Sequence, residues 1–294
     1  MCWKLRYQTG DNLAVSPHYL KSTSLSQVAK TKTRLCGEGC PFCLLDKRLI
    51  ESHLIPKGIH SLVAGDANEA ILLNSRFIMH TSRQTRDVLL CQECDNSLNR
   101  NGENWIIPKL AQADGKFVFL DILQELPPDT EKERFKIYGA AKNPSIDVNK
   151  IVHFAMGVFW KASVHSWTAN GNTPRIELGP YRDNVRDFLR GEAPFPKNVS
   201  LDLFVAPRDR APIWIAEPTR GKAEAYRNFS FYVPGIRFDL YVGKQIRDQI
   251  RQLCFYANPA HPIVVYDSSN RFLDLMKEMG RTAHKSKRVK NLFA

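Results

Sequence analysis

The sequence predicts an α+β protein with two domains, and three observations support this prediction. Five of the seven cysteines gather in two short segments, residues 36–43 and 91–94, which is the arrangement that a metal site needs. Segments with helical and strand patterns alternate in the second half of the chain. Between these regions, the Pro-Pro-Asp sequence of residues 127–129 interrupts both patterns. We therefore expect a metal-stabilised N-terminal module over residues 1–115, a linker over 116–130 and a mixed α+β domain over 131–294.

The elements of the second domain are predicted from periodicity and from breaker residues. The first is a helix over residues 146–167, which carries apolar residues on most faces and should be buried. The other expected elements are a helix over 181–190, strands over 201–205, 212–216, 229–233 and 236–242, a helix over 244–255, a strand over 263–266 and a helix over 270–279. We expect this domain to select a substrate or to bind a partner protein.

Composition and charge limit the classes of function. The 294 residues are 43% hydrophobic and carry 42 Lys and Arg against 30 Asp and Glu, a net charge of +12. This apolar fraction excludes a disordered or fibrous protein, and the positive charge favours a polyanionic partner such as nucleic acid. Five of the positive charges lie in a basic tail, residues 281–290. The most apolar run, residues 151–160, is about half of the roughly 20 residues that span a bilayer. We therefore expect a cytoplasmic protein without a membrane segment.

Two Cys-x-x-Cys pairs predict a zinc site. Each pair turns two thiolates toward one point, and two such pairs complete a tetrahedral shell. Cys40 and Cys43 form the first pair, and Cys91 and Cys94 form the second. Cys36 could substitute for Cys40, although the Pro-Phe turn between Cys40 and Cys43 favours those two residues. The alternative is that one pair is an unligated or redox-active dithiol.

Residues with side chains that could act as a base or as metal ligands lie between the two cysteine pairs and directly after the second pair. Glu51-Ser52-His53-Leu54-Ile55-Pro56 lies between them, and residues 95–105 (DNSLNRNGENW) follow Cys94. This order resembles the zinc-knuckled HNH, or ββα-metal, nuclease family, over residues 40–105 with the core motif within 36–105. It also resembles a divergent S-H-(L/I)-I-P subgroup of that family.

The resemblance implies roles for individual residues. It implies a zinc-stabilised ββα-metal module in which His53 is the general base and the residue before it, Ser52, is a metal ligand. A second ligand comes from the helix after the second knuckle, at Asp95 or Asn99. Ser52 departs from the family, which usually has Asp or His at this position, and Glu51 is the alternative.

The chemistry of phosphodiester hydrolysis requires these residue types. Histidine is the side chain whose ordinary pKa lets it deprotonate water near neutral pH. A divalent cation can neutralise the charge that develops on the phosphate. Asp95, Asn99 and Glu103 are spaced four apart, which places them on one face of a regular helix. Such an oxygen-rich stripe suits Mg²⁺ or Mn²⁺.

Two functions remain open from the sequence. The first is a metal-dependent endonuclease that cleaves nucleic acid, with DNA favoured over RNA, in the manner of a bacterial antiviral defence effector. The second is a catalytically degenerate zinc module that binds nucleic acid or a protein partner. Residues 1–110 carry 14 Lys and Arg and 10 Asp and Glu, so the region with the nuclease-like motifs is only weakly basic.

Overall fold

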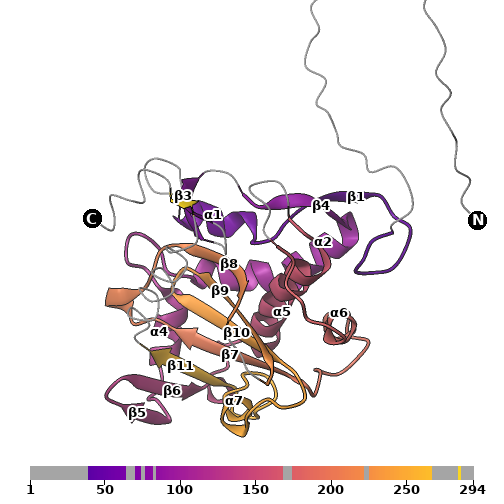
Figure 1. Cartoon of the computed structure of the whole chain (residues 1–294). Helices are drawn as coiled ribbons and strands as arrows, with labels where there is room; N and C mark the ends of the chain where they lie inside the picture. Colours follow the sequence, from indigo (N-terminus) through magenta and orange to yellow (C-terminus); the bar gives the residue numbers. More distant parts are fainter. Residues whose placement is uncertain are drawn as a thin grey trace, which may run out of the picture. The chain divides into compact units, whose positions relative to one another are not determined.

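The computed structural model describes residues 39–63, 70–73, 77–81, 84–167, 174–221, 225–266 and 284–285 (Figure 1). Its described strands form a two-stranded sheet and a ten-stranded sheet, with helices packed against them. The predicted mixed α+β class is therefore confirmed, whereas the assignment of a ββα-metal module stays a prediction. Among the described residues, no helix is both long and apolar enough to cross a membrane.

The N-terminal part contains the small sheet and a long, interrupted helix. Its elements are β1 (Leu49–His53), α1 (Lys57–Val63), β2 (Ala70–Leu73), β3 (Phe77–Thr81), β4 (Arg86–Cys91), α2 (Gln92–Leu98), the π-turn η1 (Asn99–Glu103), α3 (Asn104–Ile106) and the 3-10 turn η2 (Ile107–Lys109). Strands β1 and β4 pair antiparallel, and α2 begins directly where β4 ends. The paired strands β1 and β4 and the helix α2 therefore adjoin the cysteine segments.

The rest of the chain supplies most of the large sheet and the central helix. Its elements are α4 (Val118–Gln124), β5 (Thr130–Lys132), β6 (Phe135–Gly139), η3 (Ala140–Lys142), α5 (Val148–Val164), α6 (Tyr181–Leu189), β7 (Val199–Val205), η4 (Arg208–Arg210), β8 (Ile215–Arg220), β9 (Arg227–Val233), β10 (Ile236–Val242), α7 (Asp248–Gln252), β11 (Pro262–Tyr266) and β12 (His284–Lys285). The predicted buried helix and the strands expected over 201–205, 229–233, 236–242 and 263–266 are confirmed, whereas the strand expected over 212–216 begins later, at Ile215, and runs to Arg220. The helix expected over 244–255 is shorter, and the one expected over 270–279 lies outside the described residues.

The large sheet has the strand order β12-β3-β2-β8-β9-β10-β7-β11-β6-β5. Its centre is antiparallel, because β10 pairs along its whole length with β9 on one side and β7 on the other. The hairpin between β9 and β10 turns at Gly235, whose φ of 75° suits a residue without a Cβ atom. Strands β2 and β3, which the chain inserts between β1 and β4, extend this sheet through the parallel pairing of β2 with β8.

The hydrophobic core lies between α5 and the centre of the large sheet (Figure 1). Phe154 of α5 packs edge-on against Phe231 and Phe238, with ring centroids 6.0 and 5.7 Å apart. Phe159, one turn farther along α5, contacts Phe231 at 4.9 Å. Each buried aromatic ring contributes roughly 2–3 kcal/mol through removal of apolar surface from water, so α5 is the main fixed point for the elements around it.

The segment predicted as a linker contains a helix with a buried face. Phe119, Leu120 and Leu123 of α4 are almost fully buried. Strands that precede and follow this segment belong to the same sheet. The division into domains at residues 116–130 stays a prediction, but the candidate site is built from both sides of it.

Candidate metal centre and hydrolytic site

The first cysteine pair lies on a tight turn that precedes β1. The N–H of Cys40 donates to the carbonyl of Leu45 at 2.8 Å, and the N–H of Leu44 donates to the carbonyl of Cys40 at 2.8 Å. Leu44 has a φ of 63°, in the left-handed region. A Cβ atom on Gly39 would lie 2.7 Å from the main-chain oxygen of Leu45, so the close approach of the two ends of the turn requires glycine at this position.

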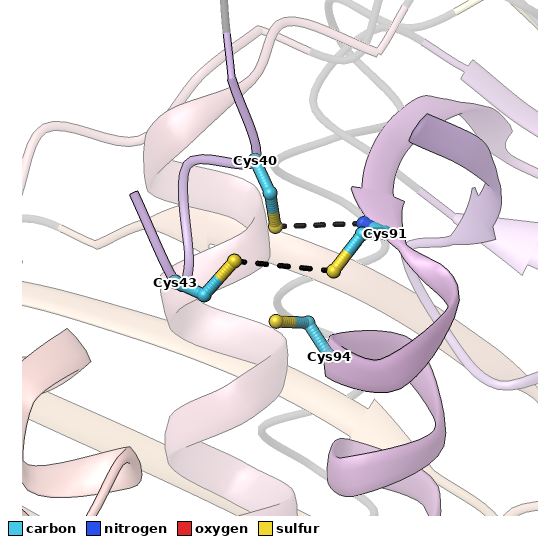
Figure 2. A group of neighbouring side chains, drawn as sticks. All are labelled: Cys40, Cys43, Cys91 and Cys94. Atoms are coloured by element: carbon cyan, nitrogen blue, oxygen red, sulfur yellow. Dashed lines mark hydrogen bonds between the residues drawn. The ribbon is translucent and has the colours of Figure 1, made fainter. Parts of the chain in front are cut away.

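The four cysteines Cys40, Cys43, Cys91 and Cys94 converge (Figure 2). Their sulfur atoms all lie within 4.8 Å of one another, and the sulfurs of Cys43 and Cys91 are 3.9 Å apart. Four sulfurs at about 2.3 Å from a tetrahedral zinc ion would be separated by about 3.8 Å. The donor set and its spacing therefore fit a metal ion, as the two pairs predict. Cys36 lies outside the described residues.

The surroundings of the cluster affect the ionisation of its thiols. Burial opposes ionisation of Cys40, but N–H groups of Cys43, Cys91 and Phe42 outweigh it and lower the pKa of the Cys40 thiol. One of these is the N–H of Cys91, which donates to the Cys40 sulfur at 3.4 Å. Burial raises the pKa of the Cys91 and Cys94 thiols. A divalent cation would offset this cost, because it binds the deprotonated thiolates.

The cysteine turn is attached to the helices of the second half of the chain. The ring of Phe42, between the first two cysteines, meets Trp160 of α5 edge-on at 5.0 Å. Arg190, at the end of α6, donates to the carbonyl of Phe42 at 3.2 Å. The cysteine turn is thus fixed to the core, and it carries two of the four thiols that could hold a metal ion.

His53 is the last residue of β1 and is half-buried. Burial lowers the pKa of its imidazole below the ordinary value, and the positive charges of Lys161 and Arg86 add to this effect. The carboxylates of Glu51 and Asp95 act in the opposite direction. His53 is therefore neutral near pH 7 and can accept a proton, and Asp95 is near enough to influence it electrostatically.

Asp95 and Asn99 form part of the predicted oxygen-rich stripe. Both are partly exposed, and the Asn99 amide nitrogen lies 3.5 Å from a carboxylate oxygen of Asp95. The helix changes to a π-turn over Asn99–Glu103, so the predicted stripe does not continue to Glu103 on a regular α-helix. In a π-turn the hydrogen bonds close from residue i to i+5, so the spacing rule of an α-helix does not decide where the Glu103 side chain points.

Glu103 instead points into the protein and binds a lysine. Its side chain is 12% exposed, and one carboxylate oxygen lies 3.3 Å from the ammonium of Lys161, whose side chain is 4% exposed. The same ammonium donates to the main-chain oxygen of His53 at 2.8 Å. Glu103 is therefore already paired with a cation.

Ser52 and Glu51 lie on opposite faces of β1, because successive side chains of a strand alternate. Ser52 is 1% exposed, and its hydroxyl has no hydrogen-bond partner among the described residues. It lies across from Asp87 of β4, which contacts Nε2 of His165 at 3.0 Å. Glu51 is exposed and pairs with Arg86 at 2.7 Å. Ser52 is thus turned away from the face that carries His53.

The remaining histidines have packing roles where they are described. His60 is 6% exposed, and burial together with the charge of His53 lowers its pKa to about 4. Nε2 of His153 lies 3.0 Å from the carbonyl of Leu189. The side chain of His80 is outside the described set.

Lys161 is the residue that sequence reasoning missed. A signal was present, since Lys161 is the single Lys, Arg, Asp or Glu within residues 151–167, the apolar part of the helix predicted over 146–167. A lysine in that position has to be paired with acceptors when it is buried. The partners themselves are 58 and 108 positions away in the chain, so local patterns could not identify them.

Comparison of the chain with known proteins found no match to a family model, a curated protein or a solved structure. The arguments about function therefore rest on the residues and geometry described above.

Proposed function

We propose that the protein is a metal-dependent HNH-like endonuclease in which the four cysteines hold a structural zinc ion. The observation that carries this proposal is the position of His53 and Asp95. His53 ends the first of two antiparallel strands, Asp95 lies in the first turn of the helix that follows the second strand, and the negative charge of Asp95 acts on the His53 imidazole. The cysteine cluster lies at the junction of that strand and helix.

The proposed chemistry gives each group a distinct role. The neutral imidazole of His53 takes the proton of the attacking water. Asp95 and Asn99 are the oxygen ligands for Mg²⁺ or Mn²⁺, which stabilises charge on the scissile phosphate when it is bound. Glu103 is removed from the ligand set because it is paired with Lys161. The substrate is nucleic acid, with DNA as the first choice.

The first test is nuclease activity of the wild type and His53→Ala. Purified protein is incubated with plasmid, single-stranded DNA and RNA, with Mg²⁺, with Mn²⁺ or with EDTA. Loss of a general base reduces turnover by about 10²–10⁴-fold. His53→Ala should therefore abolish measurable cleavage while the zinc content stays at one ion per chain. Equal activity of the two proteins would exclude His53 as the base.

A second test distinguishes a specific role of Asp95 in metal binding from the overall negative charge of the first turn of α2. Asp95→Asn removes the proposed ligand, whereas Glu93→Gln removes a 70% exposed carboxylate from the same turn and serves as the matched control. Asp95→Asn should raise the Mg²⁺ concentration needed for half-maximal cleavage at least tenfold. Glu93→Gln should leave it within twofold. Identical responses would contradict the assignment of Asp95.

A specific observation favours a second candidate, a degenerate zinc module that binds nucleic acid without cleaving it. Ser52 is buried on the face of β1 opposite His53, and Glu103 is paired with a lysine, so neither of these two expected ligands faces a site beside the His53 imidazole. This alternative predicts salt-dependent binding of labelled DNA that His53→Ala leaves unchanged, with no turnover in any metal.

A further inference from the structure

Lys161 connects three parts of the candidate site that are distant in sequence. It lies on α5, donates to the main-chain oxygen of His53 at 2.8 Å and lies 3.3 Å from a carboxylate oxygen of Glu103. Its side chain is 4% exposed, so its ammonium does not face solvent or substrate. A buried ammonium is costly unless acceptors surround it, which means that these two contacts are needed for the fold around it.

The peptide bond after His53 is held at both of its polar atoms. Its carbonyl accepts the hydrogen bond from Lys161, and its N–H, on Leu54, donates to the carbonyl of Thr85 at 2.9 Å. The hydroxyl of Thr85 donates in turn to Glu217 of β8. Both Thr85 and Glu217 are at most 2% exposed. The backbone that carries His53 is therefore fixed by α5 and by the large sheet.

Glu103 is brought to Lys161 by the π-turn. Within that turn, a Cβ atom on Gly102 would lie 2.6 Å from the backbone nitrogen of Phe154, so α5 and the turn are in direct backbone contact. The irregular turn and the glycine together place the carboxylate of Glu103 beside the lysine. π-turns of this kind are frequent at functional sites.

We propose that Lys161, paired with Glu103, is a positioning residue that sets the orientation of His53 for the reaction. This inference rests on the proposed endonuclease function. It goes beyond that function because it gives Lys161 and Glu103 a shared role, in which the ammonium holds the His53 backbone and the carboxylate holds the ammonium. Lys161 acts on the reaction through His53 and does not contact the substrate.

The experiment compares Lys161→Met with a matched control on the same helix. Lys150→Met is that control, because Lys150 also lies on α5 and donates to a main-chain oxygen, that of Arg100 in the π-turn, at 2.9 Å, but is partly exposed to solvent. Lys161→Met should lower kcat at least tenfold with KM changed by less than twofold. Lys150→Met should change both by less than twofold. Equal kcat values in wild type and folded Lys161→Met would overturn the proposal.

A second readout does not depend on catalysis. The Cε1–H signal of the His53 imidazole, followed by NMR in the full chain, should move in Lys161→Met and stay in place in Lys150→Met. If the wild type cleaves no nucleic acid but the signal moves as described, the endonuclease proposal fails and the positioning contact stands. If the signal is the same in all three proteins, the positioning contact is refuted.

A double variant separates positioning from simple charge compensation. Lys161→Met together with Glu103→Met removes both charges, and replacing a buried ion pair by apolar side chains often preserves stability. The double variant should fold and still show low kcat, because the His53 carbonyl lacks its donor. Wild-type kcat in this variant would overturn the proposal. If neither variant folds, Lys161→Arg, which keeps the charge but moves the donors, should still shift the His53 signal, and an unshifted signal would count against the proposal.

Discussion

The cysteine-bearing part of the protein and the centre of the large sheet are stabilised in different ways. Strands β7, β9 and β10 are each seven residues long, pair in continuous register and bury phenylalanine rings against α5. The small sheet pairs two strands of five and six residues with a register shift. A two-stranded sheet of this size is marginal by itself. The comparison indicates that the small sheet depends on the cysteine cluster and on contacts with α5, whereas the large sheet depends on apolar packing.

Removal of the metal should give the largest effect and the clearest separation of the two regions. Zinc binding in small domains contributes about 10–16 kcal/mol of apparent free energy. Cys94→Ser, or chelator treatment of the wild type, should therefore abolish hydrogen-exchange protection of β1, β4 and α2. Protection of β7, β9 and β10 should persist, because their register does not involve the cysteines. Hydrogen exchange with mass spectrometry measures both regions in one experiment.

Cys254→Ala is the control for this prediction. Cys254 is 1% exposed and lies outside the cluster, so its replacement removes a buried sulfur without removing a ligand. The zinc content should stay at one per chain, with protection of the small sheet intact. Loss of protection over both sheets after chelation would refute the separation of the two regions.

Much of this organisation could be predicted from the sequence where the signals are local. The two Cys-x-x-Cys pairs predicted the cluster, because the spacing itself turns both thiols to one side. The apolar run around Phe154 predicted the buried helix. The strand pair on either side of Gly235 was recognisable from alternation and a turn. In each case the element is determined by residues that lie within it in the sequence.

The parts that could not be predicted depend on residues distant in the chain. The prediction of a stripe from Asp95 to Glu103 assumed a regular helix, and no local sequence pattern predicts the π-turn. The contact of Gly102 with α5 depends on how the π-turn packs against that helix, which the sequence does not show. Likewise, the apolar neighbours of Lys161 mark it as unusual in the sequence, but they do not predict that it pairs with Glu103.

A pair of glycine substitutions tests the contact between the two regions. Gly102→Ala would place a Cβ atom 2.6–2.9 Å from the nitrogen, Cα and Cβ of Phe154, so the π-turn and α5 would have to separate. Overpacking of this kind costs typically 1–3 kcal/mol. Gly157→Ala, within α5, would meet only Leu98, at 3.5 Å, which is an ordinary contact. It should stabilise the protein by about 0.5–1 kcal/mol through helix propensity.

Urea unfolding curves of the two glycine variants measure both effects. The free energy of unfolding should fall for Gly102→Ala and rise for Gly157→Ala, with opposite signs in the same core. Hydrogen exchange in Gly102→Ala should increase in α2 and β1 more than in β10. A stabilised Gly102→Ala variant would contradict the tight backbone contact between the π-turn and α5.

The last difference between the regions is a loss of stability on raising the pH, which is expected of the large sheet. Asp202 of β7 and Asp239 of β10 are directly opposed across the strands, and each is 2% exposed. Arg237, 3.2 Å from Asp239, is a cation beside this pair, and Ser200 and Tyr241 contact the two carboxyl groups. Burial, followed by the negative charge of Asp239, raises the pKa of Asp202 to about 8.

This raised pKa predicts that the sheet loses stability as pH rises. The unfolded chain releases the Asp202 proton near pH 4, whereas the folded protein retains it up to about pH 8. The contribution of Asp202 is therefore fully present below pH 4 and decreases by at most about 1.4 kcal/mol per pH unit through this window. Asp202→Asn should flatten the dependence of the free energy of unfolding on pH between 4 and 8, whereas Asp209→Asn, at a 75% exposed carboxylate, should leave the wild-type slope. Equal slopes in all three proteins would show that Asp202 does not retain this proton in the folded protein, and the large sheet would then differ from the cysteine region by its packing alone.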